Sequence, residues 1–241
     1  MNVRILTVGD ELLTGETENT NASWLCRQLT DLGTRVDRVV VIPDVIEQIS
    51  EEVLRAQAAA DAVLVTGGVG PTHDDVTMAG IAEAIDRPLE ENETAKEWLI
   101  TEGGYAAEDL LPETTTLPAG STPLHNETGV APGAMIAGIY VFPGVPSEMR
   151  PMFKQVAEHF RGNPRYREVV VIDEPESQLL SRFKHLRSEY AIDVGSYPGE
   201  QVRVRLAGED PEEVNQAATW LREVSTVSSP EDEPGPGERD S

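Results

Sequence analysis

Short apolar runs alternate with amphipathic segments through the first third of the chain. The apolar runs are rich in β-branched residues, as in strands buried in a sheet covered on both faces, and they occupy 3–8, 36–42 and 62–66. The segments that follow them repeat apolar residues at helical spacing, over 22–32, 46–54 and 77–85. We expect Thr20 or Asn21 to cap the first helix, and Pro43 with Asp44 to open the second. This alternation predicts an α/β fold, a three-layer α/β/α arrangement around a mostly parallel sheet.

The middle of the chain is less regular. Residues 90–116 combine a helical stretch with Gly-Gly and Pro, and we expect a helical excursion that covers the site. Short strands are predicted next, at 122–124, 134–136 and 139–142. The last two of these form a hairpin about Ala137 and Gly138, and Pro146 begins a helix that runs to about Phe160.

The final third of the chain predicts a second, small α+β domain. After a break at 161–165, the pattern gives in order a strand, a helix, two strands and a helix, at 167–173, 176–190, 193–197, 201–207 and 211–224. The end of the chain is poor in apolar residues and rich in Pro, Gly and acidic residues, which predicts disorder. The predicted domains are therefore 1–165, 166–226 and a disordered acidic tail, 227–241.

Composition narrows the class of protein. The formal net charge of -24 opposes binding to nucleic acid, whose affinity comes largely from clustered Lys and Arg. The acidic residues are spread along the chain, which suggests a halophilic, salt-accumulating host cell. No apolar run approaches the length that spans a bilayer, and no basic leader precedes the first strand, so we expect a soluble cytoplasmic protein without membrane partners. The single cysteine, Cys26, fits a helical core position.

Three loops are candidate site loops. GDELLTGE at 9–16 follows the first predicted strand, TGGVGPTHDD at 66–75 follows the third, and PGVPSEM at 143–149 follows the last strand of the first domain. The first two follow parallel strands, whose carboxyl ends meet at one edge of the sheet where such folds bind ligands. We therefore expect these two loops to lie on a shared rim.

The glycine-rich turn 66–75 has the composition of a phosphate-binding loop. Gly67, Gly68 and Gly70 let backbone N–H groups approach a ligand before a helix begins. The turn matches neither the dinucleotide fingerprint nor the P-loop. Asp74 and Asp75 are placed to hold Mg²⁺ against ligand phosphates, but capping of the next helix is the alternative.

The loop 9–16 adds further carboxylates, Asp10, Glu11 and Glu16, to the same rim. Turn and cap chemistry is again the simpler explanation for them. Two acidic loops that converge on a glycine-rich turn make a divalent-metal site only if a polyphosphate ligand shares the ion, because Mg²⁺ takes few protein ligands. His73, beside the aspartates, is interpreted as a solvated loop histidine.

Five motifs, taken together and in order, resemble the amino-terminal domain of the CinA family of competence/damage-inducible proteins. They are GDELLTGE, TNAS, TGGVGPTHDD, GVAPGAMI and FPGVPSEM. That domain is similar to the molybdopterin-binding domains of MoaB, MogA and gephyrin, and ESQLLSRF with VGSYP resembles the small domain that follows it in CinA proteins. The resemblance implies a homo-oligomer. The carboxyl-terminal amidase domain of the CinA family is not recognisable here, so we expect no deamidase activity.

The resemblance implies two functions. One is metal-dependent hydrolysis of the pyrophosphate of ADP-ribose or a related dinucleotide, favoured by the Pro-Thr and Asp-Asp pairs of the turn. The alternative is binding of molybdopterin, or adenylyl transfer to it, as in molybdenum cofactor biosynthesis. A role in DNA uptake is disfavoured by the charge. The implied cofactor is a divalent metal, Mg²⁺, Mn²⁺ or Co²⁺, with molybdopterin as a second implied ligand.

Candidate site residues follow from these loops. Asp74 and Asp75 are the candidate catalytic residues, and with Asp10 they are the candidate metal ligands. The candidate residues for binding the substrate and its phosphates are Gly9, Glu11, Asn21, Thr66, Gly67, Gly68, Gly70, Pro71, Thr72, Gly144, Pro146, Ser147 and Glu148.

Overall fold

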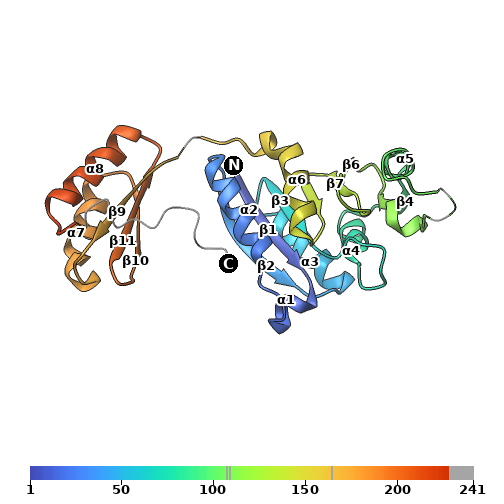
Figure 1. The fold of residues 1–241 in the computed structure, drawn as a ribbon, viewed down its shortest axis with the longest axis horizontal. Helices are drawn as coiled ribbons and strands as arrows, with labels where there is room; N and C mark the ends of the chain where they lie inside the picture. Colours follow the sequence, from blue (N-terminus) through green and yellow to red (C-terminus); the bar gives the residue numbers. More distant parts are fainter. Residues whose placement is uncertain (107, 109, 164, 228–241) are drawn as a thin grey trace. The chain divides into compact units, whose positions relative to one another are not determined.

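The computed structural model describes residues 1–106, 108, 110–163 and 165–227. The chain folds into two compact units (Figure 1). Unit 1 is Met1–Gly162, and unit 2 begins at Asn163. The division falls close to the boundary expected at 165. Among the described residues no helix is long and apolar enough to cross a membrane.

Unit 1 is built on a six-stranded sheet in the order β2-β1-β3-β8-β7-β6. The four strands β2, β1, β3 and β8 are parallel, whereas β7 is antiparallel to both of its neighbours. Their bounds are β1 Asn2–Val8, β2 Arg35–Ile42, β3 Ala62–Thr66, β6 Thr122–Leu124, β7 Gly133–Ile136 and β8 Ile139–Phe142. The mostly parallel sheet is confirmed.

Helices cover both faces of this sheet (Figure 1). α2 (Thr20–Asp31) and α6 (Pro146–Val156), followed by the 3-10 turn Ala157–Phe160, pack on one face. α3 (Ile46–Gln57) and α4 (Thr77–Ala84) pack on the other. Strand β1 contributes to both cores, because successive side chains of a strand point to opposite faces. The three-layer arrangement is confirmed.

Local structure near the first loops differs from expectation in three places. The loop after β1 contains a short helix, α1 (Asp10–Thr14), which ends at Gly15 in the left-handed conformation. The cap of α2 is Asn19, whose Oδ1 accepts the N–H of Ala22, and not Thr20 or Asn21. α3 begins at Ile46, so Asp44 lies outside the helix on the loop after β2.

The excursion 90–116 contains a small sheet that periodicity does not reveal, because its strands are three residues each. β4 (Leu89–Glu91) pairs antiparallel with β5 (Thr116–Pro118). Between them lie α5 (Glu93–Thr101), capped by Asn92, and the 3-10 turn Pro112–Thr115. α5 packs against β6 and that 3-10 turn.

Unit 2 is an α+β domain, as expected. β9 (Tyr166–Ile172), β11 (Val202–Gly208) and β10 (Asp193–Tyr197) form an antiparallel sheet in the order β10-β11-β9. α7 (Glu176–Glu189) and α8 (Pro211–Glu223) share one apolar core with it. Val227, the first residue of the predicted tail, forms an isolated bridge with Ile172, and 228–241 lie outside the described residues.

Candidate functional site

The ends of β1, β3 and β8 meet backbone to backbone at one rim of the sheet. Gly67 follows β3 with a φ of +104°, and a Cβ on it would lie 2.1 Å from the carbonyl oxygen of Val8. A Cβ on Gly144, which follows β8, would lie 3.4 Å from the Cα of Gly67. Glycine at 67 is therefore what lets the glycine-rich turn lie directly on the end of β1.

Asn21, in the first turn of α2, ties two of these loops together. Its Nδ2 donates to Thr66 Oγ1 at 3.2 Å and to the carbonyl oxygen of Gly144 at 2.7 Å. The Thr66 hydroxyl in turn donates to the carbonyl of Pro143. Both Nδ2 contacts are acceptors, so the amide orientation is determined, and Oδ1 is left buried without a partner in the described part of the chain. Asn21 is free for this role because Asn19 caps the helix.

A small cavity of about 80 Å³ lies at this junction. Its walls come from all three loops and from the start of α2, and they include Glu11, Asn21, Thr66, Gly67, Gly144 and Pro146. The structure therefore brings together six of the predicted binding residues. Gly9 follows Val8, which also lines the cavity, and the Gly9 N–H donates to the carbonyl of Ile42 at the end of β2.

The glycine-rich turn closes onto the start of α4 through Thr77. The Thr77 hydroxyl donates to the carbonyl of Gly67 at 2.8 Å, and its N–H donates to the carbonyl of Gly68. A Cβ on Gly68, which has a φ of +61°, would lie 2.6 Å from the Thr77 hydroxyl and 3.1 Å from Asp44 Oδ1. Gly68 therefore lies between a buried hydroxyl and a carboxylate.

Asp44 also lies at this rim, against Asp10 and Gly68, although sequence patterns did not select it. Its Oδ2 accepts the backbone N–H of Asp10 at 2.9 Å. Loss of hydration raises the pKa of the Asp44 carboxyl above its ordinary value, although the N–H bond acts the other way. Nearby negative charge raises that pKa further, and it comes from Asp10, Glu11 and Asp75. The sequence signal that could have identified Asp44 is its place just after β2, because the carboxyl ends of the parallel strands meet at this rim.

Replacing Asp44 with asparagine is expected to stabilise the protein at neutral pH. Because the folded-state pKa is raised, the ionised carboxylate costs stability above that pKa, and the cost disappears as the pH falls to the ordinary value of 3.8. The amide keeps an acceptor for the Asp10 N–H. In thermal melts, Asp44→Asn should raise Tm at pH 7, and the gain should shrink steadily on acidification.

The control for this variant is Asp61→Asn. Asp61 precedes β3 and so lies at the amino ends of the parallel strands, away from the rim, where its Oδ2 accepts the N–H of Asn2. It should show no such gain. A lower Tm for Asp44→Asn at pH 7 would contradict the assigned electrostatic cost.

The two adjacent aspartates of the turn point to different partners. Asp75 Oδ2 accepts the N–H and the hydroxyl of Thr72, at 3.0 and 2.6 Å. A Cβ on Gly70 would strike the same carboxylate, so Asp75 is folded back over the turn. Asp74 instead pairs with His73 at 2.8 Å, and both side chains are largely exposed. Pro71 is also exposed, and the N-cap of α4 is Val76, without a side-chain bond.

The described residues do not form a ready-made metal centre. No group of three His, Cys, Asp or Glu side chains among them is placed to hold an ion. One oxygen of Asp75 already accepts two bonds, and one oxygen of Asp44 accepts the Asp10 N–H. Asp44 and Asp75 therefore each have one carboxylate oxygen already engaged within the protein.

Residues of the loop 143–149 lie at two places, some at the rim and others against the loop that joins β6 to β7. Pro146 lines the small cavity, but Glu148 accepts the Asn126 Nδ2–H at 2.7 Å and its carboxylate lies against Gly129. Pro151 has no N–H to give to the carbonyl of Ser147 one turn earlier. That carbonyl accepts the Thr128 hydroxyl at 3.5 Å instead.

Comparison with known proteins agrees with this architecture. The model of a family described as "Probable molybdopterin binding domain" matches residues 4–162. A protein from Archaeoglobus fulgidus is 36% identical over 226 residues, which cover 93% of this chain and 98% of that protein. A protein from Aeropyrum pernix is 45% identical over 158 residues, or 63% of this chain and 59% of that protein.

A solved structure adds to this agreement. It is described as the protein CinA with unknown function from Thermoplasma acidophilum, and it matches with a TM-score of 0.62 and 34% identity. The match covers 66% of this chain and 97% of that one. The resemblance drawn from the five sequence motifs is thereby confirmed. This chain belongs to the family of the probable molybdopterin-binding domain.

Proposed function

We propose that unit 1 binds a phosphorylated pterin of the molybdopterin type at the rim where β1, β3 and β8 end. Family membership supports the ligand class. The Asn21 junction carries the proposal, because Asn21 lines a cavity bordered by all three loops and its buried Oδ1 has no partner among the described residues. A pterin ring carries amide and amine N–H groups that suit such an acceptor. An unpaired buried acceptor costs roughly 1–3 kcal/mol, which a bound N–H would recover.

In this proposal the glycine-rich turn holds the phosphate end of the ligand. Gly68 and Gly70 have no side chains that would shield their backbone from an incoming group, whereas the Gly67 N–H already donates to the carbonyl of Phe142. The surrounding carboxylates repel a bare phosphate, so we infer that a divalent ion accompanies it, held by Asp44, Asp75 or Asp10 together with ligand oxygens. Such an ion would supply charge neutralisation. The protein's own groups would bind and orient the ligand.

Copurification tests this function. The protein is isolated from a host that makes molybdopterin, denatured and oxidised, and the released fluorescent pterin is quantified per mole of protein. The wild type should carry pterin, and Asn21→Ala should carry at least about tenfold less, because both the acceptor and the link between the loops are lost. Asp61→Asn is the matched control and should keep wild-type content. Absence of pterin from the wild type would overturn the proposal.

Hydrolysis of ADP-ribose or a related dinucleotide is the second candidate, favoured by the carboxylates around Asp44. It is tested by following AMP release from ADP-ribose with Mg²⁺, Mn²⁺ or Co²⁺. Metal-dependent release that Asp75→Ala abolishes would support it. If the Asp75→Ala variant released AMP as fast as the wild type, the cleavage would not depend on the glycine-rich turn.

A further inference from the structure

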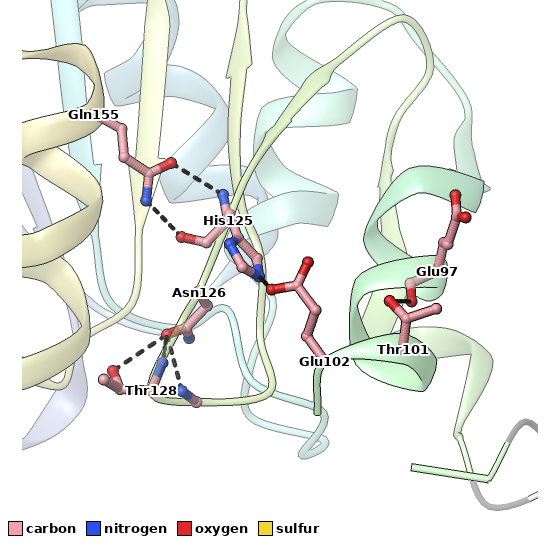
Figure 2. A network of polar contacts seen from close by, with 8 residues as sticks. Glu97, Thr101, Glu102, His125, Asn126, Thr128 and Gln155 are labelled. Atoms are coloured by element: carbon pink, nitrogen blue, oxygen red, sulfur yellow. Dashed lines mark hydrogen bonds and ion pairs between the residues drawn. The ribbon is translucent and has the colours of Figure 1, made fainter. Parts of the chain in front are cut away.

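A larger pocket, of about 370 Å³, lies between α5 and the loop that joins β6 to β7. Figure 2 shows polar contacts made by its lining residues, of Glu102 at the end of α5 with His125 and of Asn126 with Thr128 on the loop. None of its lining residues belongs to 9–16 or to the glycine-rich turn 66–75. It shares no lining residue with the small cavity at the rim, and its volume is within the range of small-molecule sites.

Three of its lining residues carry aromatic rings, Trp98, Tyr105 and His125. The rings of Trp98 and His125 lie 4.6 Å apart between centroids, tilted by 47°. The Tyr105 ring is folded over Gly103, since a Cβ there would come within 2.9 Å of that ring. Glycine at 103 thus permits Tyr105 to line the pocket beside Trp98.

The position of His125 is held by Gln155 of α6. The backbone N–H of His125 donates to Gln155 Oε1 at 3.3 Å, and Gln155 Nε2 donates to the carbonyl of His125 at 2.7 Å (Figure 2). The His125 Nε2 lies 3.5 Å from a carboxylate oxygen of Glu102. The backbone of His125 is therefore tied to α6, a helix of the unit 1 core, by two hydrogen bonds.

The charge of the pocket is negative. Its lining residues include Glu102 and Glu127 and contain no Lys or Arg. They also include Trp98 and Leu99 of the last turn of α5, and the carboxyl end of a helix carries partial negative charge. A phosphate group would be repelled here.

We propose that this pocket binds a small organic cation with an alkylated ammonium head. Such a cation is attracted to the faces of Trp98 and Tyr105, because aromatic rings carry negative charge on their faces. The carboxylates of Glu102 and Glu127 add a long-range attraction, and the methyl groups of the head bury apolar surface against the rings.

Choline and its neutral carbon isostere, 3,3-dimethyl-1-butanol, are the probes. They have the same shape and differ in charge, so titration calorimetry with each separates cation recognition from simple apolar filling. The wild type should bind choline on the order of tenfold more tightly than the isostere. Trp98→Leu and Glu102→Gln should each weaken choline binding by a similar factor.

The control variant is Glu97→Gln, on the same helix. Figure 2 shows Glu97 on the side of α5 away from His125, and it does not line the pocket. It should bind choline as the wild type does. Thermal melts of each variant verify folding, and an NMR titration that locates shifts at the Trp98 indole N–H supports the site independently. Equal affinity for both probes, undetectable choline binding, or binding unchanged in Trp98→Leu would each overturn the proposal.

Discussion

Replacing Gly67 with alanine is expected to destabilise unit 1 by at least about 3 kcal/mol and to remove ligand binding at the rim. Two costs add. The backbone φ of +104° is strained for a residue with a side chain, and the new Cβ would lie 2.1 Å from the Val8 carbonyl oxygen, far inside contact distance. The neighbour that would have to move is backbone at the end of a central buried strand. Urea unfolding of the purified variant measures the loss.

Gly15→Ala separates these two costs. Gly15 also has a positive φ, +77°, but a Cβ there meets nothing within 4 Å. That variant should lose only the conformational cost, on the order of 1 kcal/mol. Equal losses in the two variants would mean that the close approach of the β1 and β3 ends is not what requires glycine.

Phe153→Ala is expected to lower the stability of unit 1 by about 3–5 kcal/mol. Phe153 is 1% exposed in the core beneath α6. Its ring stacks on Phe160 with centroids 5.7 Å apart and meets the edge of Trp24 at 5.5 Å. Truncation removes these contacts and leaves a cavity beside two large rings that cannot both move into it.

The counterpart in unit 2 is Phe183→Ala. Each apolar core is drawn wholly from its own unit, the cores of unit 1 from 3–160 and that of unit 2 from 170–221. Calorimetric melting should therefore assign the loss in Phe153→Ala to unit 1 and the loss in Phe183→Ala to unit 2. A single transition lowered equally by both variants would contradict this assignment.

Periodicity was a sufficient guide to the sheet and its covering helices. β1 and β3 are buried on both faces, so their sequences are nearly continuous apolar runs. Turns and surface helices do not have this pattern. The short strands β4 and β5 could not be found this way. Three residues are too few to show a period, and β4 is exposed along its length, so its pairing depends on a partner more than twenty residues later.

The arrangement of the candidate site loops could be predicted from the sequence, but the contacts within them could not. Glycine spacing and the shared rim identified the turn, and Asn21 was among the predicted binding residues. The Asp75 carboxylate is oriented by its bond with Thr72, and the Asp74 carboxylate by its contact with His73. No pattern of residue types encodes which partner each carboxylate takes. Asp44 was missed because its significance depends on Asp10 and Gly68, which neighbour it only in the folded chain.

Proline at position 151 has a consequence for how unit 1 opens locally. The carbonyl of Ser147 loses its helical donor and takes one from Thr128, while Asn126 Oδ1 accepts the N–H of Gly129 and its Nδ2 binds Glu148. Fraying the start of α6 therefore exposes polar groups on the loop as well, and releasing the loop strips partners from the helix. We therefore expect the two segments to open together, so that hydrogen exchange of their amides occurs with one common opening free energy.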